Sequence, residues 1–476
     1  MIQHLKRLGG DSLLYALMNL GTKLIAFLML PIYTKYLSPY EMGAFEMVEA
    51  LTSILTFIII FGTDNALAYF FFKEVDEKEK ERLFKSTLTF RLTIALLFLL
   101  IFIIFGSSIS SLLMGTEKYK DLLYVAGIVL VLEAVITLVL TYYRFVFKSK
   151  IVASLTVFKL LLVAILSYLF LKFFNLNVLS IYESRLISGL IIIVLIYRQI
   201  WRFSSLKIEK DIIKKILWYG APLVPASLAF WVITFSNRFF LSTFESLESS
   251  GIYGVAVKFA TMISLLTSGV QMAWRPYSMS IKDDPKAKNI YANIFYIILV
   301  IGFIGILIIA TIAPFLKILV ADKSYYSALN YIALLSLGSF LSFYYLIISV
   351  GLFIKEKTSV ISFYVIICSG ISIVLNLLLI PLFSIWGAVF ALIFSYLLVN
   401  VLIFIKSQSV YKIPVSSIKL IVVFIIGFVS VLSIVSIYFY KLNFYLIIFP
   451  WLVFLLVTWK VFDTKNIMAL VRGRFN

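Results

Sequence analysis

The chain is short of the residues on which most enzymes and small secreted domains depend. Its 476 residues include one cysteine, Cys368, and one histidine, His4. A lone cysteine excludes a disulfide framework and a cysteine-based metal site, and Cys368 lies in an apolar run, where we expect a small core residue. Without a usable histidine or a glycine-rich phosphate loop that follows a strand, we expect no catalysis, no cofactor and no metal.

Charged residues are also scarce. They make up 14% of the chain, against 62% hydrophobic residues, whereas soluble domains average about 25% and about 45–50%. Many apolar runs exceed about 18 residues, which excludes the short alternating strands of a membrane β-barrel. The first run is too long for a signal peptide and no cleavage site follows it. These features predict an all-α membrane protein.

Apolar runs divide the chain into fourteen predicted transmembrane helices. Their ranges are 11–36, 42–72, 88–109, 122–147, 151–174, 178–200, 212–243, 249–280, 290–314, 327–354, 358–380, 384–405, 415–439 and 443–461. An even number of spans places both termini on the same side of the membrane.

Basic residues indicate which side that is. The net charge of +19 would suggest a nucleic-acid partner in a soluble protein, but here Lys and Arg concentrate in alternate loops, including 73–85 and 198–215. By the positive-inside rule these loops and both termini are cytoplasmic. We therefore expect a multi-pass protein of the cytoplasmic membrane with no nucleic-acid partner, in which 198–215 forms a cytoplasmic linker that includes an amphipathic surface helix.

The chain also matches itself at a shift of about 207 residues. This shift places Gly62 on Gly269, and a slip of one residue places Gly43 on Gly251. Six spans then fall on the next six, which predicts a parallel repeat of two six-helix lobes around a central cavity. The expected parts are the N-lobe (1–208), the C-lobe (209–408), and two appended helices with a cytoplasmic tail (409–476).

Several cations lie inside spans, where an uncompensated charge is costly and usually has a function. Lys23 is in the middle of the first span, with Asn19 on the same helical face. Arg238 and Lys258 lie toward the outer ends of the seventh and eighth spans. We interpret these four residues as candidates for an anion-accepting cavity. The alternatives are that Lys23 neutralises a carboxylate of the second span and that Arg238 and Lys258 extend to the membrane interface.

Acidic and polar residues suggest gates and ion pairs. Glu46 and Glu49 share one face of the second span and either pair with cations of the opposite lobe or remain solvated. The repeat relates Asp64 to Gln271, which makes both candidates for an inner gate or for a plain interfacial role.

Two further sets of residues concern packing and bending. We predict an ion pair between Glu133 and Lys159, and we expect Arg91 and Arg185 to extend to the membrane interface. Pro222 and Pro225 either bend the seventh span as a hinge or occupy its first turn without effect.

Three segments, residues 37–72, 219–241 and 251–277, give the chain a resemblance to a known family. They resemble the Wzx-type lipid-linked oligosaccharide flippases, which are the polysaccharide-transport branch of the multidrug/oligosaccharidyl-lipid/polysaccharide exporter superfamily. The resemblance implies alternating access of two lobes around a cationic cavity that accepts the pyrophosphate-sugar head of a polyprenyl-linked (undecaprenyl-type) substrate. It matches Lys23 and Lys258 to basic residues on spans one and eight of such flippases.

The resemblance also implies partners and leaves alternatives. A polysaccharide polymerase and glycosyltransferases are expected partners, and H⁺ or Na⁺ is the expected coupling ion. Many relatives carry Asp-Arg where this chain has Asn237-Arg238, and Glu46 and Glu49 stand near a region that is basic in lipid II flippases. The alternatives are a lipid II-type flippase, a cation-coupled multidrug exporter, or a scaffold for glycan synthesis.

Overall fold

A computed structural model describes residue 14 and residues 17–174, 177–204 and 209–461, and these described residues contain helices and no strand. By length and apolarity 12 helices suffice to cross a membrane, or 14 spans if each of two bent helix pairs counts as one. The predicted all-α membrane fold is therefore confirmed, and the span number reaches the predicted fourteen when both bent pairs are counted. His4, the beginning of the first predicted span and the tail after residue 461 lie outside the described residues.

Each predicted span corresponds to a helix or a helix pair. In order they are Leu17–Tyr36 (which ends in α2, Leu30–Tyr36), α3 (Pro39–Ile60) with α4 (Thr63–Lys73), α5 (Glu77–Met114), α6 (Lys120–Phe145), α7 (Ser149–Phe173), α8 (Leu179–Leu195) with α9 (Tyr197–Phe203), α11 (Val224–Phe244), α12 (Leu247–Ala260) with α13 (Ile263–Ser280), α14 (Ala287–Ile312), α15 (Ile332–Ile348) with α16 (Val350–Ile354), α17 (Ser359–Phe383), α18 (Ile385–Val410), α19 (Ser417–Phe439) and α20 (Ile448–Val461). Short 3₁₀ helices connect some of them: η1 (Glu117–Tyr119), η2 (Ala221–Leu223), η3 (Ala313–Ile318), η4 (Lys323–Asn330) and η5 (Phe444–Ile447).

Several predicted spans contain breaks that hydrophobicity does not reveal. The second span divides at Phe61 and Gly62, which both have positive φ. The sixth and eighth spans bend by 74° and 56°. The seventh span was predicted from residue 212, but α10 (Lys210–Gly220) and η2 precede α11, so the predicted single helix is wrong there. Residues 251–254 lie inside α12.

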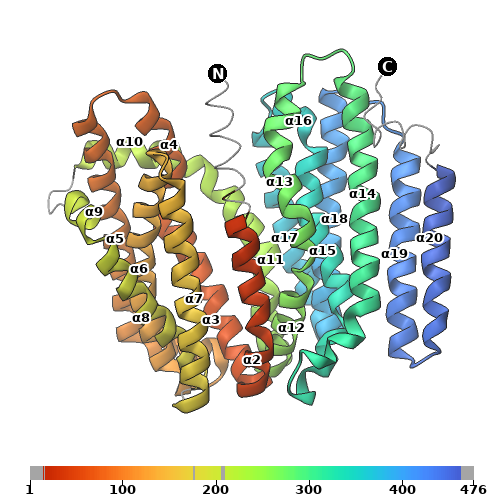
Figure 1. Cartoon of the computed structure of the whole chain (residues 1–476), viewed down its shortest axis with the longest axis horizontal. Coiled ribbons are helices and arrows are strands. Elements are labelled where there is room, and N and C mark those ends of the chain that lie inside the picture. The colour runs from red at the N-terminus through yellow and green to blue at the C-terminus, as the bar shows by residue number, and fades with distance from the viewer. Residues whose placement is uncertain (1–13, 15–16, 175–176, 205–208, 462–476) are drawn as a thin grey trace. The chain divides into compact units, whose positions relative to one another are not determined.

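The chain divides into two compact units, residues 1–254 and residues 255–476. In the first unit α5 and α6 pack along each other, and α8 packs on both α6 and α7 (Figure 1). Phe84 is fully buried, and its ring stacks on Phe203 at 5.1 Å and meets Tyr142 edge-on at 5.3 Å. This aromatic core joins α5, α6 and α9, so that the end of the sixth span is attached to its own unit.

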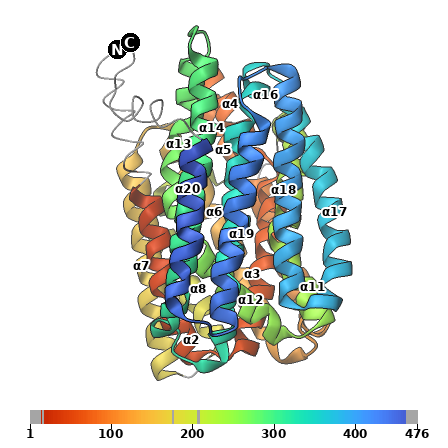
Figure 2. The ribbon, with the colours of Figure 1, turned by 90° about the vertical axis from the view of Figure 1, so that its right-hand side faces the viewer.

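The second unit contains α13 to α20, and α19 and α20 stand side by side in Figure 2. Both helices contact α14. Trp451 of α20 donates to Thr311 Oγ1 at 3.0 Å, and Tyr438 of α19 donates to the Thr311 carbonyl at 3.0 Å. Phe303 of α14 also packs against Phe424 of α19 and Phe454 of α20, so both appended helices are fixed to α14. The lobes drawn from the repeat stay a prediction, because a compact unit and a sequence repeat are different properties.

Candidate functional site

Two helices of the first unit meet without side chains between them. A Cβ atom added to Gly43 of α3 would overlap the carbonyl oxygen of Leu247, which begins α12. One added to Gly251 of α12 would overlap the carbonyl oxygen of Pro39, which begins α3. We call these four residues the glycine contact. Only glycine allows two helix backbones to approach so closely.

The glycine contact is reciprocal in the repeat. The alignment that places Gly43 on Gly251 also places Pro39 on Leu247. Gly43 faces Leu247, and Gly251 faces Pro39. The same contact is therefore made twice, once in each direction. Such a pattern is characteristic of a two-fold axis, as in an isologous interface between identical subunits. The first turns of α3 and α12 thus close on each other through positions that the predicted repeat makes equivalent.

A buried ion pair lies beside the glycine contact. The Nε atom of Arg238 on α11 donates to Glu46 Oε2 on α3 at 2.8 Å, and both side chains are almost fully buried. Gly254 provides the necessary room, because a Cβ there would overlap the Glu46 side chain. Gly254 is the repeat counterpart of Glu46. The two predicted repeats therefore differ at this position, since one supplies the carboxylate and the other the space for it.

The guanidinium of Arg238 has further contacts in the same place. It donates from Nη1 to the Thr234 carbonyl at 3.2 Å and lies 4.9 Å from the centre of the Phe235 ring. The next residue back, Asn237, is fully buried and donates to the Tyr253 hydroxyl at 2.9 Å. In this arrangement the positive charge of Arg238 faces a carboxylate rather than solvent.

Glu49, unlike Glu46, pairs with a residue of its own predicted repeat. Arg185 on α8 forms an ion pair with Glu49, and the Tyr182 hydroxyl donates to Glu49 Oε1 at 2.8 Å. Pairing with a cation of the opposite repeat therefore applies to Glu46 alone. The expectation that Arg185 extends to the membrane interface is wrong, because its charge is satisfied inside the first repeat.

Arg91, which was also expected to extend to the membrane interface, does not do so. Its side chain is fully buried on α5, where Nη2 donates to Asp64 Oδ1 at 2.7 Å and Nε donates to Thr63 Oγ1 at 2.9 Å. Asp64 and Thr63 begin α4, immediately after the Phe61–Gly62 break. Asp64 thus holds α4 to α5 in the first unit. Gln271 is exposed on α13 of the second unit.

The predicted ion pair between Glu133 and Lys159 is present and joins α6 to α7. The remaining candidate cations are only partly exposed. Lys23 and Asn19 lie on the helix Leu17–Tyr36, and Lys258 lies near the end of α12. Among the described residues no group of three His, Cys, Asp or Glu side chains is placed to hold a metal ion.

The two prolines of the seventh span occupy its beginning. Pro222 lies in η2 and Pro225 in the first turn of α11, where a missing N–H costs little. The break before them touches the break in the second span, because a Cβ on Gly62 would lie 2.5 Å from the Gly220 carbonyl oxygen. We call this the Gly62–Gly220 contact. No feature of either span alone predicts that the two breaks meet.

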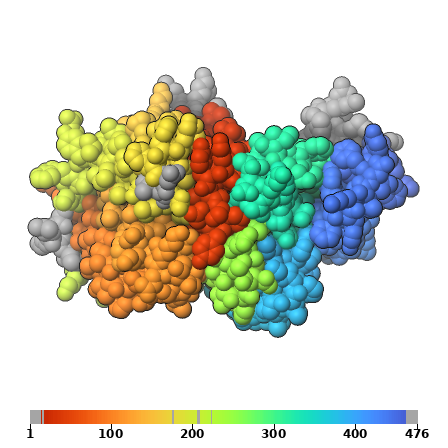
Figure 3. Space-filling model, turned by 90° about the horizontal axis from the view of Figure 1, so that it is seen from below, coloured from red at the N-terminus to blue at the C-terminus, as the bar shows by residue number. Residues whose placement is uncertain are grey.

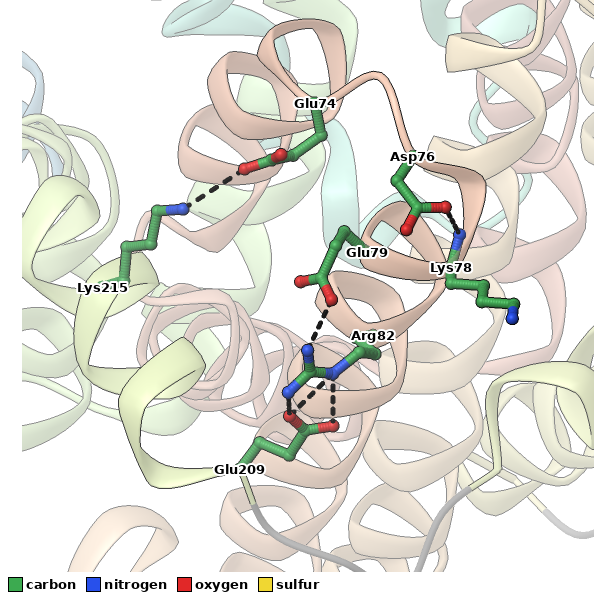
Figure 4. A network of polar contacts seen from close by, with 7 residues as sticks. All are labelled: Glu74, Asp76, Lys78, Glu79, Arg82, Glu209 and Lys215. Carbon is green, nitrogen blue, oxygen red and sulfur yellow. Dashed lines mark hydrogen bonds and ion pairs between the residues drawn. The ribbon is translucent and has the colours of Figure 1, made fainter.

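Beyond the Gly62–Gly220 contact, α4 and α10 are attached to each other. The Tyr69 and Tyr219 rings stack at 4.8 Å, and Lys215 pairs with Glu74 at 3.5 Å. In Figure 4 Arg82 of α5 lies between Glu79 and Glu209, pairing with both. These ion pairs connect the segment at residues 73–85 with the linker before the seventh span.

A family model described as "Polysaccharide biosynthesis protein" matches residues 8–282. The chain belongs to this family. No curated protein matches it. The matched range of the polysaccharide biosynthesis family contains both glycines of the glycine contact, the Glu46–Arg238 pair and the Gly62–Gly220 contact.

Solved structures share the fold of this family member. The lipid II flippase MurJ in an inward closed conformation is 14% identical with a TM-score of 0.75, and the alignment covers 97% of this chain and 100% of that one. An inward-facing multidrug resistance MATE family transporter of the MOP superfamily is 15% identical with a TM-score of 0.61, covering 81% of this chain and 94% of that one. A mutant of the Vibrio cholerae MATE transporter VcmN is 11% identical with a TM-score of 0.56, and the alignment covers 85% of this chain and 96% of that one. These structures show the same fold, and the family model confirms the predicted resemblance to a polysaccharide-transport family.

Proposed function

We propose that this protein is a flippase that moves polyprenyl-pyrophosphate-linked oligosaccharide units across the cytoplasmic membrane by alternating access, for the synthesis of surface polysaccharide. The observation that carries the proposal is the glycine contact with its Glu46–Arg238 pair. It joins equivalent turns of two repeats at one end of the spans, as a closed gate of an alternating-access transporter must. Membership of the polysaccharide biosynthesis family supports the class of substrate.

The positive-inside rule puts this gate on the outer side. With the outer gate closed, a substrate enters from the cytoplasmic side, and Lys23 and Lys258, together with Asn19, attract its anionic pyrophosphate deeper in the protein. Opening of the outer gate requires Arg238 to leave Glu46. Its guanidinium then becomes available to the pyrophosphate, so that substrate replaces the carboxylate that held the gate. A polysaccharide polymerase and glycosyltransferases are the proposed partners, and H⁺ or Na⁺ the proposed coupling ion.

The test is transport by the full chain in proteoliposomes. The substitutions Lys23→Gln and Lys258→Gln together should abolish flipping of a labelled polyprenyl-pyrophosphate glycan, because each removes a charge that faces the pyrophosphate. The measurement is the fraction of label that becomes accessible on the far side of the vesicle. The control carries Lys118→Gln and Lys120→Gln, which remove the same charge from the exposed surface beside η1.

Three results would contradict the proposal. The first is unchanged flipping by the Lys23 and Lys258 variant with an intact unfolding transition. The second is equal loss by the control. The third is a lack of turnover by the unmodified protein together with binding of glycan-synthesis enzymes, which favours a scaffold. Inhibition by cationic dyes but not by anionic polyprenyl phosphates would favour the multidrug exporter.

A further inference from the structure

A hollow of about 370 Å³ lies at one end of the second unit. Its walls are the end of α14 with η3, the short helix η4, the start of α15 and the last turn of α19. The turn after α19 lies beside η3 and η4 at this end of the second unit, and this end faces the viewer in Figure 3. No residue of this hollow belongs to the gate or to the candidate cavity described above.

The lining combines an apolar base with polar groups, which is the usual composition of a ligand site. Ala310, Ala313, Pro314, Leu329, Ala333 and Val435 supply apolar surface, while Lys317, Tyr326, Ser327, Asn330, Tyr438 and Lys441 supply polar groups. Pockets for drug-sized ligands measure about 300–1,000 Å³. At about 370 Å³ this hollow is near the lower limit, so it suits a small headgroup rather than a whole lipid.

Two lysines give the hollow its charge. Lys317 reaches it from η3, and Lys441 reaches it from the turn after α19. Neither forms an ion pair with a carboxylate in the part of the chain that the structure describes. No Asp or Glu lines the hollow, so its net charge is positive.

The positions of both lysines are fixed by local structure. Lys441 has a φ of 52°, and its N–H donates to the Tyr438 carbonyl at 3.1 Å, which closes a tight turn. The ammonium of Lys317 lies 5.6 Å from the centre of the Tyr326 ring, within the range of a cation–π contact. The charges are therefore held at the hollow by a turn and by an aromatic ring.

We propose that this hollow binds the phosphate group of an anionic phospholipid. Lys317 and Lys441 pair with the phosphate, and the hydroxyl and amide groups of Tyr326, Ser327 and Asn330 hydrogen-bond to the rest of the headgroup. Exposed apolar side chains adjoin the hollow, among them Phe439 at the end of α19 and Ile318 at the end of η3, at 53% and 88% exposure. They provide the surface on which acyl chains lie, which a free anion would not need.

The bound lipid has a structural consequence for the appended helices. It connects η3 and η4 with the end of α19 at the same end of α14 where Thr311 holds Tyr438 and Trp451. This role does not depend on the identity of the transported substrate.

The experiment measures phospholipid binding to the full-length protein by native mass spectrometry. Phosphatidylglycerol and phosphatidylcholine are titrated separately against the unmodified protein and against the double variant Lys317→Gln, Lys441→Gln. Each lysine near anionic lipid should contribute about fivefold, so the double variant should bind phosphatidylglycerol roughly 25-fold more weakly. The charge-matched control is Lys323→Gln with Lys118→Gln, two exposed lysines that do not line the hollow, and it should retain its affinity.

A second measurement uses the unmodified protein. Acetylation of Lys317 and Lys441 by a water-soluble reagent, mapped by mass spectrometry, should slow about tenfold or more in phosphatidylglycerol nanodiscs relative to phosphatidylcholine, while Lys323 reacts equally in both. Equal loss of affinity in the two double variants would overturn the proposal, as would equal acetylation rates. Displacement of the lipid by millimolar inorganic phosphate would overturn the assignment to a lipid in favour of a free anion.

Discussion

At the residue scale, the Glu46–Arg238 pair and the Glu133–Lys159 pair present a useful contrast. The first has side-chain exposures of 2% and 6%, and the second 27% and 21%. Removing one member of a buried pair leaves an uncompensated charge, whereas removing one member of a partly solvated pair costs little. The same chemical change should therefore have different effects at the two sites.

We expect Glu46→Gln to lower the free energy of unfolding by about 3–5 kcal/mol, and Glu133→Gln by about 1 kcal/mol or less. Denaturant titration of the purified protein in detergent measures both. Adding Arg238→Met to Glu46→Gln should restore much of the lost stability, because no buried charge remains. If Glu46→Gln costs no more than Glu133→Gln, the pair is not a buried interaction that holds α3 to α11.

The sequence predicted the Glu133–Lys159 pair but not the particular partners of Glu46 and Glu49. Glu46 and Glu49 are three residues apart on one helix, yet one pairs with Arg238 and the other with Arg185. Helical spacing tells which residues share a face, but the neighbour of that face depends on tertiary packing. Arg91 and Arg185 were misjudged for the same reason, since Asp64 and Glu49 lie on other helices. Gly254 was visible in the sequence, but its role as room for Glu46 was not.

At the scale of elements, the breaks in the second and seventh spans meet at the Gly62–Gly220 contact. Apolar runs predict the length of a span because the bilayer requires about 20 residues, but they carry no signal for an internal break. Gly62 was the available hint. Its φ of 70° is a conformation that other residues adopt at a cost.

Gly62→Ala and Gly115→Ala separate backbone strain from helix contact. Both glycines have a φ of 70°, but a Cβ on Gly115 meets open space and one on Gly62 meets the Gly220 backbone. Gly115→Ala should cost about 1–2 kcal/mol of stability with little change in flipping rate. Gly62→Ala should cost more and slow flipping at least severalfold, because it forces α4 away from the start of η2. Equal effects of the two substitutions in unfolding and transport assays would show that the contact contributes nothing.

At the scale of the whole molecule, the predicted topology follows from the distribution of basic residues, and the structure supplies sites at which to test it. Lys78 and Lys282 lie between predicted spans at cytoplasmic positions, and Lys118 and Lys323 lie at outer positions. Lys78 and Lys118 belong to the first compact unit, and Lys282 and Lys323 belong to the second. All four are outside the apolar interior, whereas the natural Cys368 is buried. Single cysteines at these positions therefore report sidedness in each unit independently.

In a Cys368→Ala background, a membrane-impermeant maleimide applied to intact cells should label Lys118→Cys and Lys323→Cys, and it should label Lys78→Cys and Lys282→Cys only after the membrane is opened. The positive-inside rule predicts this because Lys and Arg concentrate in the loops that contain residues 78 and 282. Agreement in one unit and reversal in the other would require an even number of crossings between Lys118 and Lys282, in place of the five predicted spans that separate them. One of the two bent pairs, α8 with α9 or α12 with α13, would then fail to cross the membrane. The labelling thus tests orientation and span number together.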